Sequence, residues 1–139
     1  MDRAQLTGWI DHYERAWRTA GTDVLPELFT EDASYSTAPY EDPHRGLGAI
    51  AETWEAERVG PDEEFEMVSE ILAVEAHTGF ARVTVVHEEA EQKERRLHRQ
   101  QEQYRDLWVV RLDEAGLCFH FEEWPFWPPD QNGAPATGG

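Results

Sequence analysis

The fold turns on residues 28–33, which read Leu28-Phe29-Thr30-Glu31-Asp32-Ala33. Phe29 is expected to anchor a short helix, residues 23–29, on the core. Asp23 is a good N-cap for that helix, because its carboxylate accepts the first free backbone N–H groups. Asp32 then accepts N–H bonds in the turn that opens the first strand. The stretch therefore marks a change from helical to extended chain.

Upstream of this stretch, apolar side chains recur at spacings of three and four residues, which is typical of a helix with one buried stripe. They are Leu6, Trp9, Ile10, Tyr13, Ala16, Trp17 and Ala20. Thr7 is one candidate N-cap, and a start one turn earlier is the alternative. Gly21 favours the C-terminal end of the helix, because glycine accepts the left-handed backbone found there.

Downstream, Gly46 and Gly48 open a third helix. It runs through Ile50 and Trp54 and ends at the Gly60-Pro61 pair, since the residue before a proline avoids helical geometry. The N-terminal half is therefore expected to carry three helices.

In the second half of the chain, residues 80–87 alternate apolar and polar side chains with a period of two, as strands half-buried in a sheet do, whereas residues 65–76 alternate irregularly. Ala81, Val83 and Val85 share one face, and Arg82 and Thr84 share the other. The expected strands are residues 65–76, 80–87, 104–112 and 117–124, with turns at Thr78-Gly79 and at residues 113–116. We interpret the charged residues 88–103 as a hairpin tip and residues 130–139 as a flexible tail.

The composition excludes several classes of function. The chain has 139 residues, enough for one domain, with 29 acidic and 12 basic side chains and a formal net charge of −17. Such a charge disfavours nucleic acids and anionic membranes as partners. Cys118 is the only cysteine, so there is no intrachain disulfide and no cysteine-based zinc site. The first residues lack the apolar core of a signal peptide, and we expect a cytoplasmic location.

Three stretches together resemble the nuclear transport factor 2-like and ketosteroid-isomerase-like superfamily, in particular its polyketide-cyclase-like (SnoaL-like) branch. They are residues 28–33, Pro43-His44-Arg45-Gly46-Leu47-Gly48-Ala49-Ile50 and Val110-Arg111-Leu112-Asp113-Glu114-Ala115-Gly116. The resemblance covers residues 6–128 and implies a single α+β domain, residues 1–129. In that fold a curved mixed or antiparallel sheet, with three helices packed on its concave face, forms a cone with an apolar interior.

The resemblance also implies where catalytic groups would lie. In the isomerases of this superfamily a carboxylate moves a proton, while a helix tyrosine and a late-strand carboxylic acid stabilise the enolate. The first position falls on Thr37 and the last on Trp108, so steroid isomerisation by that mechanism is not expected. Tyr13 does match the helix tyrosine. Its hydroxyl either faces a ligand or is satisfied by a neighbouring protein group.

Asp106 is the best candidate for a functional carboxylate. If Trp108 faces the interior, alternation places Tyr104, Asp106 and Val110 on the same face. Burial beside aromatic rings raises the pKa of a carboxyl group and suits it to act as a base near neutral pH. The alternative is a structural ion pair with Arg82 or Arg105.

His87 ends the strand of residues 80–87 and is a candidate partner for Asp106 in an acid–base dyad. The alternative is a solvated residue at a strand end. A metal site built from His87, His120 and Glu122 lacks the compact spacing that typifies zinc ligands, so neither a metal nor a cofactor is expected.

The remaining candidates are aromatic or imidazole side chains expected to line the interior and contact a ligand. They are Trp17, Trp54, Tyr104, Trp108, Trp124 and His120. The aromatic residues 122–128 fit a cavity wall, a dimer face or core packing equally well.

Two functions remain in view. One is a domain that binds a small hydrophobic molecule, or acts on it as a cofactor-free cyclase, isomerase or dehydratase if the molecule bears a carbonyl group. The other is a non-catalytic scaffold that dimerises through the outer face of its sheet and binds a ligand or peptide. The superfamily hosts both kinds, so the resemblance does not decide between them.

Overall fold

Residues 3–17 form the first helix because a capping box fixes their start. The computed structural model describes residues 1–57, 64–88 and 102–126, in which α1 spans Arg3–Trp17. The Asp2 carboxylate accepts the Gln5 backbone N–H at 2.8 Å, and Gln5 Oε1 accepts the Asp2 N–H at 2.9 Å. The N-cap is therefore Asp2 and not Thr7, which confirms the alternative of an earlier start. The stripe facing the core holds Leu6, Trp9, Ile10, Tyr13 and Ala16.

The expected helix over residues 23–29 is wrong. Only Leu25–Glu27 are helical, as one 3₁₀ turn (η1), and Phe29 already begins strand β1 (Phe29–Ser36). The carbonyl oxygen of Leu28 explains the early end, because it accepts the Cys118 backbone N–H at 2.7 Å and the Trp9 indole N–H at 3.0 Å. These bonds hold Leu28 against Cys118 and against α1, so a second helical turn does not form.

The other expected helix is confirmed as α2 (Leu47–Glu57), which follows the two-residue strand β2 (His44–Arg45). Gly46 joins them with φ of 90°, a left-handed geometry that favours glycine. The described residues thus contain two α-helices where three were expected. The predicted stop at Gly60-Pro61 lies outside the described residues. Neither α-helix is long and apolar enough to cross a membrane.

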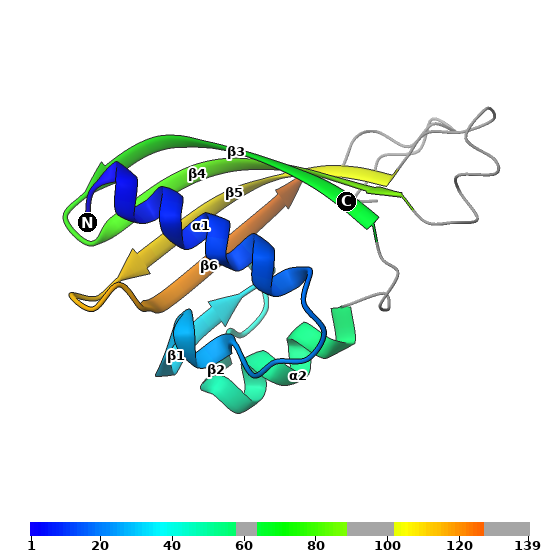
Figure 1. The fold of residues 1–139 in the computed structure, drawn as a ribbon, viewed down its shortest axis with the longest axis horizontal. Helices are drawn as coiled ribbons and strands as arrows, with labels where there is room; N and C mark the ends of the chain where they lie inside the picture. The colour runs from blue at the N-terminus through cyan, green and yellow to red at the C-terminus, as the bar shows by residue number, and fades with distance from the viewer. Residues whose placement is uncertain (58–63, 89–101, 127–139) are drawn as a thin grey trace.

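Four long strands follow: β3 (Glu64–Glu75), β4 (Thr78–Glu88), β5 (Glu102–Leu112) and β6 (Cys118–Phe126). The sheet order is β2-β1-β6-β5-β4-β3, in which β1 and β6 are parallel and every other pair is antiparallel. Figure 1 shows α1 lying across one face of this sheet, with α2 beside β1 and β2. We call the face toward the helices the inner face, and the opposite one the outer face.

Two turns connect these strands, and one differs from its prediction. The β5–β6 turn is confirmed, since the Asp113 carboxylate accepts the backbone N–H groups of Ala115 and Leu117, both at 2.9 Å. The β3–β4 turn lies at residues 76–77 instead of at Thr78-Gly79, which belong to β4. Gly79 lies in the strand because the Leu6 side chain of α1 packs directly over it. The predicted hairpin tip and C-terminal tail lie mostly or wholly outside the described residues.

Candidate functional site

The inner face of β5 carries Asp106 into the protein, as alternation along the strand predicts. Asp106 is 2% exposed, Trp108 is 2% exposed and Val110 is fully buried. The neighbouring strands contribute Val83, which is opposite Asp106 on β4, and Pro125, which is opposite it on β6. The side chain of Tyr104, expected in the same row, lies outside the described residues. Asp106 is thus a buried carboxyl group in an apolar setting.

The Asp106 carboxyl group accepts a hydrogen bond that the sequence did not predict. Trp108 Nε1 donates to Oδ2 at 3.0 Å. Burial raises the pKa of Asp106 above its ordinary value, and the bonds from Glu123 and Trp108 offset only part of that rise. Oδ1 meets no N–H or hydroxyl donor within the described part of the chain.

Aromatic rings pack around this carboxyl group. The Tyr13 ring lies 4.8 Å from the Trp108 ring and 5.1 Å from the Trp54 ring, measured between centroids. Trp17 also packs against Trp54, with 4.8 Å between the ring centroids. In the interior that was expected to bind a ligand, Trp54 and Trp108 therefore contact Tyr13, and Trp17 contacts Trp54.

Two polar atoms inside this cluster differ in how they are satisfied. The Tyr13 hydroxyl hydrogen-bonds with the Tyr35 hydroxyl at 2.8 Å, the protein-satisfied alternative for this tyrosine. Trp54 Nε1 is buried, and no hydrogen-bond partner for it exists among the described residues. A buried indole N–H without an acceptor is uncommon, because most buried donors are paired.

The register of β4 and β5 separates His87 from Asp106. Val83 is opposite Asp106, whereas His87 is opposite Glu102, four residues further along β4. At about 3.3 Å per residue, the two backbones are offset by roughly 13 Å along the strand. The side chain of His87 lies outside the described residues, so the acid–base dyad stays a prediction.

His120 and Trp124 lie on the outer face, away from Asp106, although both were expected to line the interior. Phe121 between them stacks on Tyr13 at 5.5 Å and so fixes which face of β6 is the inner one. His120 Nε2 and Glu122 Oε1 are 2.9 Å apart, and Trp124 Nε1 donates to Glu122 Oε2 at 2.6 Å. Partial burial opposes ionisation of Glu122, but these bonds outweigh it and lower its pKa.

The alternative role for Asp106, an ion pair with Arg82 or Arg105, does not match the geometry. Arg82 lies 3.3 Å from the Glu70 carboxylate on the outer face. Arg105 is exposed and alternates with Asp106 along β5, so it also projects outward.

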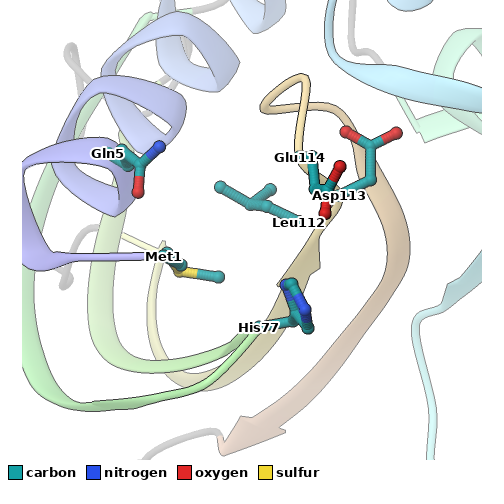
Figure 2. Close-up of a pocket in the computed structure, with 6 residues that line it drawn as sticks. All are labelled: Met1, Gln5, His77, Leu112, Asp113 and Glu114. Atoms are coloured by element: carbon teal, nitrogen blue, oxygen red, sulfur yellow. The ribbon is translucent and has the colours of Figure 1, made fainter.

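A separate cavity lies at the opposite end of α1, between the helix start and the β5–β6 turn (Figure 2). Its volume is about 170 Å³, below the range of about 300–1,000 Å³ usual for ligand pockets. The polar groups there already serve the fold, because the Met1 ammonium donates to the Ala76 carbonyl at 3.0 Å and Asp113 holds the turn. The Asp106 region is the stronger candidate.

Glu123 and Tyr35 are the site residues that the sequence analysis missed. Glu123 follows Glu122 in a Glu-Glu-Trp stretch, and its pairing with Trp108 in the ladder places it on the inner face, which the sequence alone does not indicate. Tyr35 comes after Asp32 on the predicted first strand. Alternation of side chains along that strand could have predicted that the Tyr35 hydroxyl group points toward the interior.

The comparisons with known proteins bear on the fold. No family model matches the sequence, and no curated protein does either. An LEH-like epoxide hydrolase of M. tuberculosis superposes with a TM-score of 0.64 at 12% identity, covering 88% of this chain and 84% of that one. An NTF2-like protein of unknown function from Exiguobacterium sp. 255-15 gives 0.62 at 15%, covering 85% and 98%. RV0760c of M. tuberculosis gives 0.69 at 9%, covering 96% of each chain.

Each superposition covers most of this chain and most of the compared chain. The sequence identities are too low to infer that the proteins share an activity. They agree with the mixed six-stranded sheet and its helices on one face. The chain therefore has the fold of the NTF2-like proteins.

Proposed function

We propose that the chain is a small-molecule-binding domain whose site lies on the inner face, between Asp106 and Trp54. The observation that carries this proposal is the buried Trp54 N–H without an acceptor. Leaving such a donor unpaired costs about 1–3 kcal/mol. A ligand that offers an acceptor oxygen recovers this energy.

The neighbours of that N–H define the ligand. Tyr13 packs against both Trp54 and Trp108, so the donor is one ring away from the indole that holds Asp106. In this proposal the ligand is a hydrophobic molecule with a carbonyl group. Its oxygen accepts the Trp54 N–H, and its carbon skeleton lies among the rings.

The same arrangement suits acid–base chemistry without a cofactor. The ionised form of a carboxyl group with a raised pKa is a stronger base than an ordinary carboxylate. It removes a proton from the carbon next to a carbonyl, while the N–H donor stabilises the developing enolate oxygen. Isomerisation, cyclisation and dehydration of carbonyl compounds all begin with this step. In this proposal Asp106 is the base and Trp54 the donor.

Binding is tested with Prodan, a neutral naphthyl ketone whose emission shifts to the red when its carbonyl accepts a hydrogen bond. Trp54→Phe should weaken Prodan binding about two- to tenfold, the range that one hydrogen bond provides, and should remove the red shift. Trp9→Phe is the control, because its N–H already has the Leu28 carbonyl as partner. Unchanged Prodan emission in Trp54→Phe contradicts the proposal.

Proton transfer is tested separately with acetophenone in D₂O. The wild-type chain should catalyse exchange of the methyl protons next to the carbonyl, as followed by NMR, and Asp106→Asn should lose the exchange. Equal exchange in the two proteins removes Asp106 from the mechanism and leaves a binding domain without catalysis.

A specific observation also favours the second function, a dimeric scaffold. Val68, Trp124 and Phe126 are 69%, 38% and 60% exposed on the outer face. We propose that a second copy of this chain covers that face. The proposal is compatible with ligand binding, because the two sites use opposite faces of the sheet.

A further inference from the structure

Two buried side-chain atoms have no hydrogen-bond partner among the residues that the structure describes, and they differ in what they need. Trp54 Nε1 is a donor, whereas Asp106 Oδ1 is a carboxyl oxygen. Asp106 is 2% exposed and Trp54 is fully buried, so bulk water does not reach either side chain. Because most buried polar groups in folded proteins are paired, both atoms require an explanation.

The strands beside Asp106 explain why the fold leaves Oδ1 without a donor. Val83 and Pro125 are opposite Asp106 on β4 and β6, and neither side chain carries an N–H or hydroxyl group. The Trp108 indole N–H reaches the other oxygen, Oδ2, at 3.0 Å. Within the described ranges the fold therefore provides a donor for one carboxyl oxygen and none for the other.

Both unpaired atoms belong to one cluster of side chains. The Tyr13 ring centroid lies 5.1 Å from that of Trp54 and 4.8 Å from that of Trp108, whose N–H holds Asp106. The Tyr13 hydroxyl group bonds to Tyr35 and is engaged within the protein. The donor and the oxygen are thus linked through two ring contacts and one hydrogen bond.

A hydroxyl group is the ligand group that suits Asp106 Oδ1. It donates to this oxygen when the carboxyl group is ionised, and it is also able to accept when the carboxyl group is protonated. An ether or ketone oxygen only accepts, so it does not pair with a carboxylate. A ligand carboxylate would place a like charge beside Asp106.

We propose that the ligand of this site carries a hydroxyl group as well as a carbonyl group, and that the hydroxyl group hydrogen-bonds with Asp106 Oδ1. This inference rests on the proposed function, in which the Trp54 N–H binds the carbonyl oxygen. The ligand class is a neutral, hydrophobic hydroxyketone. A carboxylate oxygen has two lone pairs, so the contact leaves Asp106 able to take up a proton.

The hydroxyl contact is tested by calorimetric titration, near neutral pH, with acetylnaphthalenes substituted on the ring that does not carry the acetyl group. Hydroxy and methoxy compounds are compared at two ring positions, which sample two distances from the carbonyl group. At one position or both, the hydroxy compound should bind the wild type about tenfold or more tightly than its methoxy partner, as a hydrogen bond to a charged group provides. No preference at either position, or no binding of any of these compounds, overturns the inference.

Substitution of Asp106 shows whether this residue is the source of the preference. Asp106→Leu removes both carboxyl oxygens and should reduce the hydroxyl preference to about twofold or less. Asp11→Leu, the same change on the exposed side of α1, is the matched control and should keep the preference. An unchanged preference in Asp106→Leu overturns the inference. If backbone amide spectra show that Asp106→Leu does not fold, Asp106→Asn removes the charge alone and should still reduce the preference severalfold.

Glu123 also acts on the pKa of Asp106, so Glu123→Leu is measured in parallel. The hydroxyl preference should persist in this variant. A preference that is lost in Glu123→Leu and kept in Asp106→Leu would assign the hydroxyl contact to Glu123 and overturn its assignment to Asp106.

The two proposals fail separately when Trp54→Phe is titrated with the same compounds. If this variant weakens binding of every ketone and the wild type shows no hydroxyl preference, the proposed function stands and the hydroxyl contact falls. If the preference depends on Asp106 while Trp54→Phe leaves every affinity unchanged, the hydroxyl contact stands and the proposed role of Trp54 falls.

Discussion

Asp106 is a buried acid whose pKa is raised, and this fixes the sign of its effect on stability. Between the pKa of an unfolded Asp, near 4, and the higher folded value, the folded state binds more protons than the unfolded state. The contribution of Asp106 to the free energy of unfolding therefore decreases as pH rises through that window and is constant above it. Asp106→Asn cannot ionise and should gain stability relative to the wild type as pH rises from about 4 through the folded pKa of Asp106.

Urea unfolding at several pH values measures this difference. Asp11→Asn, an exposed change on α1, is the control for the general effect of removing one negative charge from an acidic chain. Parallel stability curves for Asp106→Asn and the wild type would show that the carboxyl group is as solvated in the native state as in the unfolded chain.

The contribution of the hydrogen bond between the Tyr13 and Tyr35 hydroxyl groups to the free energy of unfolding can be measured by substitution. Tyr13→Phe and Tyr35→Phe each remove one oxygen from a 2.8 Å bond and should each lower the free energy of unfolding by about 1 kcal/mol. The double variant should cost less than the sum of the two, since the bond is lost only once. Strict additivity would mean that the two hydroxyl groups contribute independently.

Among the secondary-structure elements, the long periodic ones were predictable and the short ones were not. α1, β4 and β5 follow from sustained repeats of three to four residues or of two residues, whereas β3 was predicted in spite of its irregular alternation. Residues 23–29 show helical spacing over a single turn, too little to resist the bonds that pull Leu28 into the sheet. The local spacing of apolar residues does not predict this tertiary contact of Leu28.

The β3–β4 turn was misplaced for a related reason. Glycine usually marks a turn, but Gly79 sits within β4 because a neighbour needs the room. A Cβ atom added there would lie 2.5 Å from Leu6 Cδ2. A glycine in a turn and a glycine in a strand beneath a close neighbour look the same in the sequence. Only the packing of α1 on the sheet distinguishes them.

This packing gives a paired prediction on glycine. Gly79→Ala should destabilise the protein by about 1–3 kcal/mol, because the new methyl group forces Leu6 away from the core. Gly8→Ala, where α1 leaves open space, should stabilise it by about 0.5–1 kcal/mol through helix propensity. Thermal unfolding of both variants is the measurement. A Gly79→Ala protein as stable as the wild type would mean that α1 does not sit tightly on β4.

Across the whole molecule, the inner row of β5 could be predicted but the faces of β6 could not. Asp106 and Trp108 follow from alternation along an uninterrupted strand. On β6 the register shifts between the pairs Leu112–Cys118 and Arg111–His120, which leaves Phe119 as an extra residue. One inserted residue exchanges the faces beyond it, so Trp124 lies outside where a simple count from Cys118 would place it inside.

The outer face that results has the size and pattern of an interface. Four strands of about ten residues cover roughly 19 Å by 33 Å, which approaches the roughly 800 Å² per partner of a standard interface. Two adjacent rows cross it, one with Val68, Thr84, Arg105 and Phe126, the other with Glu70, Arg82, Leu107 and Trp124. Opposite charges interleaved with apolar side chains can pair with their own copy about a twofold axis.

If a second copy covers this face as proposed, replacing one central apolar side chain should separate the copies. Leu107→Glu puts a carboxylate in the row that also holds Glu70, so sedimentation should change from a dimer to a monomer, and the emission of Trp124 should shift to the red. Asp11→Asn, on α1 and away from this face, should stay dimeric. Since each copy carries a formal charge of −17, added salt should strengthen wild-type dimerisation by screening the repulsion between copies. A wild-type chain that sediments as a monomer at high salt would leave the exposed Val68 and Phe126 to a different partner.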